Sequence, residues 1–481
     1  MLNSEAMHSG RLTRMSDEFS VMGNERRGWP VGLMRINTGI IRMNNEQKTK
    51  SYEIPKREVW EAWKRVKSNK GSAGVDGISI EQFESKLSKS LYKVWNRMSA
   101  GSYFPGAVKR VEIPKADGSM RPLGIPNVCD RIAQDVVRAR LEVVLEPIFH
   151  NDSYGFRPKR SAHDAIEKCK SRCQKYDWVI DLDISKYFDT IDHELLMKAV
   201  HKHCQIPWMI MYIERWLKAP VVLTTGEAIS NNTGTPQGGV ISPLLANLFL
   251  HYVFDRWINK YHPHVLFERY ADDLIVHCKT EAEAKWILEQ IKQRFKECSL
   301  TVHPEKTKVV YCRDYRRNDK SHKTIKFDFL GVTFCPRCAT SKINGKAVVR
   351  FWPSASSKAK KRLRDKIKTV INSKQQMLGV EELAFKVNPI ISGWMNYFAR
   401  YFGTRSIVFY IQKRLTNWLM RKRLFNTRRA VLWLVRCRRN SEKTFCTLVL
   451  LNTIDWRSRM TGDCHVRFCE ELGVKFLGLT R

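Results

Sequence analysis

Apolar residues recur every three or four positions between Tyr52 and Ala107, which is the spacing of one face of a helix. The sequence contains two such faces, separated by a glycine-rich stretch over 71–77 that predicts a turn. The first face consists of Val59, Trp60, Trp63 and Val66, and the second of Phe83, Leu87, Leu91 and Val94. Helices are therefore expected early in the folded part of the chain.

A β-hairpin is predicted next. Apolar and polar residues alternate over Val108–Pro114, Asp117-Gly118 is a strong turn signal, and a second strand follows over Arg121–Ile125. Helical spacing returns over 131–145 and again over about 162–175. This part of the chain is expected to fold as a hairpin followed by two helices.

Two later segments are strongly apolar and have the length of strands. They are Trp178–Ile184, and Val265–Tyr270 with its continuation Leu274–Cys278. Helical patterns precede and follow them, so a mixed α/β layer is expected. Beyond about Gly331 the sequence becomes basic and helical, which predicts a domain boundary near residues 335–352.

The chain carries a large positive charge. Its 481 residues exceed what one hydrophobic core usually supports, so two or three domains are expected. Lys and Arg number 84 against 48 Asp and Glu, which gives a formal net charge of +36. This charge favours a nucleic-acid partner over a small metabolite, although a merely basic protein would have the same composition.

Cysteine usage and hydropathy narrow the class of protein further. The 13 cysteines are scattered without a regular framework, which favours reduced thiols in a cytoplasmic protein. The longest apolar stretches, such as Val240–Leu250, are too short to cross a bilayer. Residues 1–50 are basic and lack the apolar region of a secretory signal, so we expect a mobile leader there.

The sharpest chemical signal is Tyr270-Ala-Asp-Asp273, which lies between two apolar β-segments. Adjacent carboxylates in such a place are costly unless a cation or metal meets them. A hairpin tip that presents Asp272 and Asp273 to Mg²⁺ would remove this cost. An exposed Asp-Asp turn between two ordinary strands is the alternative, and the motif alone does not decide between them.

A second acidic segment lies upstream. Asp181 and Asp183 are two residues apart in a predicted strand and therefore share one face. A carboxylate at the end of that strand could complete a site for two Mg²⁺ ions, which suits phosphoryl or nucleotidyl transfer. We interpret Asp189 and Asp192 as turn and capping residues, and the role of Asp181 stays open.

At these residues the chain resembles a known family. The stretch 183–193 resembles polymerase motif A, 234–247 resembles motif B, and Tyr270–Asp273 resembles motif C. In this order they resemble the reverse transcriptases encoded by group II introns. The resemblance covers residues 55–430 and includes 121–126, 153–158, 305–307, 329–331 and the maturase-like (X) segment Asn388–Phe398.

The resemblance implies an α+β fold. A right-hand polymerase, with fingers and palm of mixed and antiparallel sheet and a catalytic hairpin, would occupy 51–334. An α-helical thumb or maturase (X) domain would follow at 350–430. Residues 431–481 are expected to form a basic C-terminal segment, for which DNA binding is a hypothesis. No HNH endonuclease motif is recognised there, which puts second-strand DNA cleavage in doubt.

The resemblance also implies site residues. Asp183, Asp272 and Asp273 would be the catalytic carboxylates, and together with Ile184 they would hold two Mg²⁺ ions. Phe188 would stack under the incoming sugar and leave no room for a 2′-hydroxyl. The other residues expected to bind the deoxynucleoside triphosphate (dNTP) are Lys115, Arg121, Gln237 and Lys306.

The nucleotide-binding assignments have plainer alternatives. Lys115 and Arg121 could belong to a solvated hairpin tip. The stretch 237–239 could be only a loop before a helix. Lys306 could be an ordinary surface lysine, with Lys308 two residues further on as a rival.

The helix predicted over 355–371 is intensely basic. We expect positive charge on every face, which favours contact with RNA phosphates, with a solvated face as the competing explanation. The expected RNA-binding residues are Lys358, Lys361, Arg362, Arg364 and Lys368. Cys335 and Cys338 have the spacing of half a zinc site, but no second pair follows at a useful distance, so we favour free thiols.

The leading hypothesis is an RNA-directed DNA polymerase that is also a maturase, binding group II intron RNA to promote splicing and mobility, with a DNA target as a further partner. One alternative is an RNA-binding maturase with a vestigial polymerase, which the intact carboxylates oppose. Another is a retron or defence-type reverse transcriptase, which Asn388–Phe398 disfavours. We expect a bacterial-type cytoplasmic location and no membrane partner, with an organelle as the alternative.

Overall fold

The computed structural model describes residues 50–114, 120–340, 347–372, 378–422, 426 and 428–430. These residues form two compact units that alternate along the chain. The first unit comprises the described residues up to 160 together with 184–264 and 290–302, and the second comprises 161–183, 265–289 and the described residues from 303 onward. The expected leader and C-terminal segment, over 1–49 and 431–481, lie outside the described residues.

Helices begin the first unit, as the apolar spacing predicted. They are α2 (Lys56–Ser68), α3 (Ile80–Ser85) and α4 (Leu87–Ser99). In α2, Val59 and Trp63 are buried, whereas Trp60, which was expected on the same face, is exposed. Successive helical residues are about 100° apart around the axis, so Trp60 points away from the stripe that Val59 and Trp63 share.

The predicted hairpin is present in the first unit. Strands β1 (Val108–Pro114) and β2 (Met120–Ile125) pair antiparallel. Two short strands extend this sheet in the order β2-β1-β4-β5; they are β4 (Val221–Val222), which is parallel to β1, and β5 (Ala228–Ile229). The tip of the hairpin, 115–119, lies outside the described residues.

The remaining helices of the first unit follow the hairpin, and two of them, α7 and α10, begin within the stretches that resemble motif A and motif B. They are α5 (Val128–Leu145), the 3₁₀ turn η1 (Glu146–Ile148), α7 (Tyr187–Thr190), α8 (His193–His203), α9 (Pro207–Leu217), α10 (Ser242–Leu250), the π-helical turn η2 (His251–Asp255) and α11 (Arg256–Tyr261). The Asp192 carboxylate accepts a hydrogen bond of 2.9 Å from the N–H of Leu195 at the start of α8. Its interpretation as a capping residue is thus confirmed.

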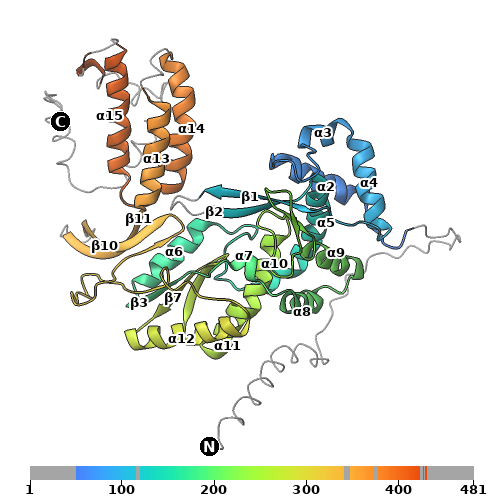
Figure 1. Ribbon diagram of the computed structural model, residues 1–481. Coiled ribbons are helices and arrows are strands. Elements are labelled where there is room, and N and C mark those ends of the chain that lie inside the picture. The colour runs from blue at the N-terminus through green and yellow to red at the C-terminus, as the bar shows by residue number, and fades with distance from the viewer. Residues whose placement is uncertain are drawn as a thin grey trace, which may run out of the picture. The chain divides into compact units, whose positions relative to one another are not determined.

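A four-stranded sheet, which we call the carboxylate sheet, lies in the second unit. Its order is β6-β7-β3-β8, and all neighbours are antiparallel. The strands are β3 (Trp178–Leu182), β6 (Leu266–Tyr270), β7 (Asp273–Cys278) and β8 (Lys308–Tyr311). Helix α6 (Ala162–Cys173) packs on β6 and β7 (Figure 1). Helix α12 (Glu281–Glu297) passes from the second unit into the first.

A second sheet and a helical bundle follow in the second unit. Strands β9 (Phe327–Phe329), β10 (Val332–Thr340) and β11 (Ala347–Ala355) form a three-stranded sheet, so the domain boundary expected near 335–352 coincides with a hairpin. Helices α13 (Ser357–Val370), α14 (Val380–Phe398) and α15 (Arg405–Arg421) pack around a shared apolar core (Figure 1). The predicted α+β class, with a helical part after the sheets, is confirmed. No helix in the described part of the chain has the length and hydropathy needed to cross a membrane.

Candidate active site

A tight hairpin carries the two adjacent carboxylates. Strands β6 and β7 pair antiparallel, and Tyr270 opposite Asp273 is the last pair before the turn. Ala271, the first residue of that turn, has φ of 56°, which is unusual for a residue with a Cβ. Conformations of this kind persist where the surrounding structure holds them. Asp272 and Asp273 therefore lie at a hairpin tip, as the sequence predicted.

The neighbouring strand brings two more carboxylates to this tip. Strand β3 pairs with β7 so that Asp181 lies opposite Ile275. Asp273 precedes Ile275 by two residues and so points to the same face as Asp181. Asp183 follows the end of β3, where its carbonyl oxygen accepts a hydrogen bond of 2.8 Å from the N–H of His303. The antiparallel pairing places the end of β3 beside the start of β7.

Two of the clustered carboxyls, Asp273 and Asp181, have raised pKa values. Desolvation by the surrounding protein, followed by the charges of Asp272 and Asp183, raises the pKa of Asp273 to about 7. Desolvation, followed by Asp273, raises the pKa of Asp181 to about 8. The side chain of Asp273 is nonetheless exposed to solvent, so a cation can reach it. Asp181, whose role the sequence left open, thus belongs to the cluster.

Two lysines flank the carboxylates. Lys306 Nζ lies 3.5 Å from Asp183 Oδ1, and its side chain is 52% exposed. Lys308 lies opposite Asp181 on β8 and lowers the pKa of that carboxyl, which partly opposes the effect of burial. Of the two lysines weighed in the sequence, Lys306 is therefore the one in contact with an expected metal-binding carboxylate.

The donor set fits magnesium. Mg²⁺ prefers oxygen ligands, and the charge of a divalent ion lowers the cost of holding several carboxylates together. The side chain of Ile184 is buried and apolar, so the oxygen that this residue can offer is its main-chain carbonyl. The carboxylates that can share the ions are Asp181, Asp183, Asp272 and Asp273.

The first unit brings together three of the residues expected to bind the nucleotide. Phe188 is buried in the short helix α7, and its carbonyl oxygen accepts a hydrogen bond of 2.7 Å from the N–H of Thr235. Thr235 belongs to the loop 234–239, which also holds Gln237. Arg121 Nε donates to the Gln237 side-chain oxygen at 2.8 Å. Lys115, the fourth residue expected here, lies outside the described residues.

Glycine lets this loop approach strand β2 closely. Gly238 has φ of +125°, and a Cβ at this position would lie 2.3 Å from the Gly124 carbonyl oxygen. The N–H of Gly124 in turn donates to the Gln237 carbonyl oxygen at 2.7 Å. A side chain at Gly238 would force the two segments apart. Gly238 is thus required for close contact between the loop and β2.

Helix α13 carries the expected RNA-binding residues on an exposed surface, which we call the cationic surface. The prediction that charge surrounds this helix was wrong, because Leu363 and Ile367 are buried in the core shared with α14 and α15. Their spacing of four residues makes an apolar stripe that is narrow enough to be overlooked in so basic a segment. The five expected residues Lys358, Lys361, Arg362, Arg364 and Lys368 are all exposed, and so is Lys366.

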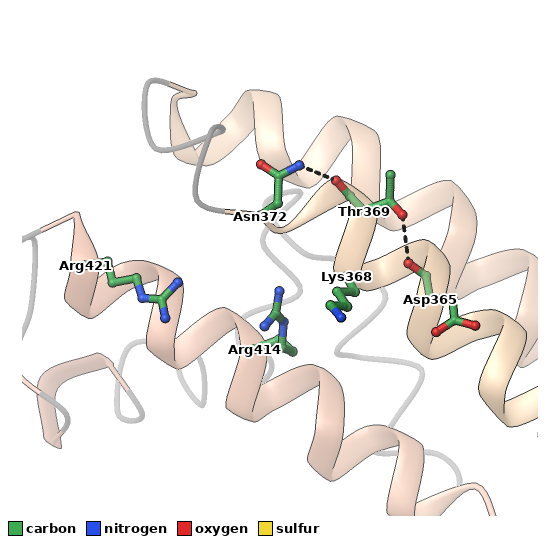
Figure 2. A pocket seen from close by; sticks show the side chains of 6 residues that line it. All are labelled: Asp365, Lys368, Thr369, Asn372, Arg414 and Arg421. Carbon is green, nitrogen blue, oxygen red and sulfur yellow. Dashed lines mark hydrogen bonds between the residues drawn. The ribbon is translucent and has the colours of Figure 1, made fainter.

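A cationic pocket lies between α13 and α15. Its volume is about 530 Å³. Figure 2 shows the side chains of Lys368, Arg414 and Arg421 extending from the two helices into this space. Arg414 donates to the Ile371 carbonyl oxygen, while its Nε is buried without a hydrogen-bond partner among the described residues. Asp365 is the single acidic residue of the lining, so the pocket favours an anion.

The two cysteines with zinc-like spacing diverge. Cys335 and Cys338 both lie in β10, where they pair with Trp352 and Val349. Because alternate residues of a strand point to opposite faces, side chains three positions apart point away from each other. Cys335 and Cys338 therefore cannot supply two ligands to one ion while β10 keeps this conformation.

Comparisons with known proteins agree with this geometry. Residues 113–334 match the family described as "Reverse transcriptase (RNA-dependent DNA polymerase)", and residues 360–435 match "Group II intron, maturase-specific domain". The chain is 33% identical over 293 residues to Protein YkfC of Escherichia coli, covering 53% of this chain and 77% of that protein.

Two further relatives are intron proteins. The group II intron-encoded protein LtrA of Lactococcus lactis is 37% identical over 191 residues, covering 40% of this chain and 32% of LtrA. The putative COX1/OXI3 intron 2 protein of Saccharomyces cerevisiae is 31% identical over 299 residues, covering 60% of this chain and 32% of the yeast protein. The match thus spans about a third of each of these two relatives.

The fold and the matches define the class as RNA-directed DNA polymerase. More narrowly, the chain belongs to the reverse transcriptases encoded by group II introns, and the α13–α15 bundle falls within their maturase-specific domain. Proteins of this family act on nucleic acid, require metal ions and function in intron splicing and mobility. These properties are the ones that the carboxylate hairpin and the cationic surface lead us to expect.

Proposed function

We propose that this chain copies RNA into DNA with Asp183, Asp272 and Asp273 holding two Mg²⁺ ions. The observation that carries the proposal is the convergence of these residues with Asp181 at the β6–β7 hairpin tip, where the pKa of Asp273 is raised to about 7. Repelling carboxylates in an accessible position are stabilised by a divalent ion. Two ions at such a site would stabilise the attacking and leaving oxygens of nucleotidyl transfer.

The protein's own groups prepare this site for the ions. Lys306 holds Asp183 through a half-exposed contact of 3.5 Å, which is weak enough to exchange for other partners. We propose that Lys306 turns from Asp183 to the triphosphate when the ions bind. The main-chain carbonyl of Ile184, next to Asp183, is the further oxygen that we assign to the metal site.

We assign recognition of the deoxynucleotide to three residues of the first unit, Phe188, Arg121 and Gln237. Phe188 would lie under the sugar, and its ring would exclude a 2′-hydroxyl by steric conflict. Arg121 would neutralise charge on the triphosphate, together with Lys115. The hydrogen bond of 2.8 Å from Arg121 supports the position of Gln237, which would contact the new base pair.

We assign contact with intron RNA to the cationic surface of α13. All five of its expected RNA-binding side chains are exposed, which supports contact with phosphates. The adjacent pocket adds Arg414 and Arg421 to the positive charge. A group II intron RNA, a DNA target and a bacterial cytoplasm complete the proposal. An organelle is the alternative location, and a maturase with little polymerase activity is the alternative function.

Primer extension on an RNA template tests the proposal. Asp272→Ala should slow extension by at least a hundredfold, about 2.7 kcal/mol in the barrier, because a metal ligand is lost. RNA affinity should stay unchanged. The matched control Asp319→Ala removes an exposed carboxylate from the loop after β8 and should extend at the wild-type rate. Extension by Asp272→Ala near the wild-type rate would refute the metal assignment, and a wild-type chain that promotes splicing without extension would favour the alternative function.

A further inference from the structure

A buried arginine lies two residues before the turn that leads to Asp272. Arg269 belongs to β6 and is 0% exposed, which makes it one of the largest fully buried side chains in the described part of the chain. Removing a guanidinium from water is costly unless hydrogen bonds and charges compensate for it. In the proposed function Arg269 is neither a metal ligand nor a nucleotide-binding residue. A charge kept buried at this cost, beside the catalytic motif, indicates a role in the site.

Arg269 leaves the sheet on the face opposite to Asp273. In the register of β6 and β7, Arg269 lies opposite Leu274. The next pair, Tyr270 opposite Asp273, points to the other face, because successive residues of a strand alternate. Leu274 and Val276, which share the face of Arg269, are buried. Arg269 therefore supports the hairpin tip from behind, and a guanidinium, which has no acceptor atom, cannot itself bind a metal ion.

The guanidinium reaches the turn of the hairpin. Arg269 Nη1 donates a buried hydrogen bond of 3.2 Å to the carbonyl oxygen of Ala271. That carbonyl belongs to the peptide group between Ala271 and Asp272, which is the central peptide of the two-residue turn between Tyr270 and Asp273. A hydrogen bond from a charged donor is stronger in a buried place than in water. Arg269 therefore holds the peptide group from which Asp272 extends.

The residues of the turn do not themselves favour its conformation. Two-residue hairpin turns are mostly of type I′, with positive φ at both residues, or type II′, with positive φ at the first residue alone. The two types differ in the orientation of the central peptide. Of the two turn residues, both described, Ala271 has φ of 56° and Asp272 does not have a positive φ, as in type II′. Type II′ favours glycine at the position where this chain has alanine, so a contact from outside the turn is needed to select it.

We propose that Arg269 is a positioning residue of the polymerase, whose hydrogen bond selects the orientation of the central peptide and so directs the Asp272 carboxylate to the metal site. This inference rests on the proposed function, in which Asp272 binds Mg²⁺. Rotation of the central peptide to the type I′ orientation would require a positive φ at Asp272 and would redirect its side chain. The competing explanation is that Arg269 only stabilises the packed sheet.

The magnesium requirement of primer extension by the full chain tests the proposal. Arg269→Met keeps much of the length of the side chain but has no donor. The Mg²⁺ concentration for half-maximal extension should rise about tenfold, because groups that orient metal ligands typically contribute about 10- to 100-fold to metal affinity. The matched control is Arg172→Met, since Arg172 is also buried and donates to a carbonyl of β6, that of Phe267 at 2.7 Å, away from the turn. The control should lower the melting temperature and keep the wild-type Mg²⁺ requirement.

A glycine in the turn provides a rescue experiment. Glycine adopts positive φ without steric cost and is preferred at the first position of type II′ turns, so Ala271→Gly lets the turn sequence itself select the observed conformation. Adding Ala271→Gly to Arg269→Met should therefore restore most of the affinity for Mg²⁺. Adding it to Arg172→Met should leave the melting temperature as low as before. A purely structural role of Arg269 predicts no recovery of the Mg²⁺ requirement.

The outcomes separate this inference from the proposed function. A wild-type Mg²⁺ requirement in Arg269→Met, with extension lost in Asp272→Ala, would overturn the role of Arg269 and leave the metal assignment intact. Should Arg269→Met not fold, Arg269→Lys replaces it, with a smaller rise expected because the charge and a donor are kept. An equal rise in Arg172→Met, no recovery with Ala271→Gly, or loss of folding in both Arg269 variants would assign Arg269 to the stability of the sheet alone and overturn the proposal. Near wild-type extension by Asp272→Ala would instead refute the proposed function.

Discussion

The hairpin tip of β6 and β7 and the cationic surface of α13 both concentrate like charges, but they do so at different densities. At the tip, desolvation, followed by the nearby charges of Asp272 and Asp183, raises the pKa of Asp273 to about 7. On α13 the cations project separately into solvent from a helix whose apolar stripe is buried. Closely spaced carboxylates favour the binding of divalent ions at one place. Dispersed charge instead suits many weak contacts along a phosphate backbone.

This difference predicts that binding and chemistry can be removed independently. Replacing Lys361, Arg362 and Arg364 with Gln should weaken RNA affinity about a hundredfold at 0.1 M salt and flatten the slope of log affinity against log salt by about two units, because each phosphate contact contributes about 0.7 to 0.9 to that slope. The extension rate at saturating RNA should stay unchanged. A salt titration of binding to a structured RNA measures both quantities.

The matched control for this variant lies on another helix. Lys89, Lys93 and Arg97 of α4 are exposed, and their replacement by Gln removes the same charge. That control should keep the wild-type slope. Equal flattening in the two variants would attribute RNA binding to total charge and not to the cationic surface.

A pH dependence should distinguish the dense cluster from the dispersed one. Magnesium must displace protons from Asp273 and Asp181, whose pKa values are raised to about 7 and about 8. The Mg²⁺ concentration for half-maximal extension should therefore fall as pH rises from about 6.5 to 8.5, by up to about tenfold per unit. Asp181→Asn should flatten the upper part of this profile. RNA affinity measured in parallel should vary little over the same range.

As pH rises, the raised pKa values should strengthen magnesium binding but weaken the stability of the metal-free chain. Because the folded-state pKa of Asp181 is raised from 3.8 to about 8, the metal-free folded chain binds more protons than the unfolded chain between these values. Its melting temperature should fall as pH rises through this window, and Mg²⁺ should restore it. A metal-free melting temperature that rises over the window and is insensitive to Asp181→Asn would contradict the cluster.

The smallest effect is expected from a change of Phe188, which we assign to contact with the sugar of the nucleotide. Phe188→Ala should raise the incorporation of ribonucleotides relative to deoxynucleotides by about tenfold, because steric discrimination by one group in a pocket is worth about 1 to 3 kcal/mol. Phe188 is buried, so Phe188→Leu is the control that keeps most of the packing and should give a smaller change. Competition between labelled nucleotides measures the ratio. An unchanged ratio in both variants would remove Phe188 from this role.

The sequence revealed the parts of this protein whose signals are local. Asp117-Gly118 between two alternating segments predicted the hairpin of β1 and β2, and adjacent Asp272 and Asp273 inside an apolar run predicted the hairpin tip. In each case the residues that determine the structure are close together in the sequence. The family resemblance then predicted the order of the domains.

Features that depend on neighbours distant in sequence were not predictable in this way. Asp181 could not be assigned, because its high pKa arises from burial and from Asp273, which lies on another strand. The packing of α13 was missed, because two buried residues are inconspicuous among so many cations.

Iron-directed cleavage tests the central claim most directly, namely that the catalytic ions lie at the dense carboxylate cluster and not on the cationic surface. Fe²⁺ replaces Mg²⁺ in the protein, and ascorbate with peroxide then produces hydroxyl radicals that cut the backbone beside the bound ion. We predict cuts next to Asp183 and next to Asp272–Asp273 that excess Mg²⁺ suppresses, with none over Ser357–Val370. Absence of cuts at both acidic segments, or cuts there that Mg²⁺ does not suppress, would contradict the account.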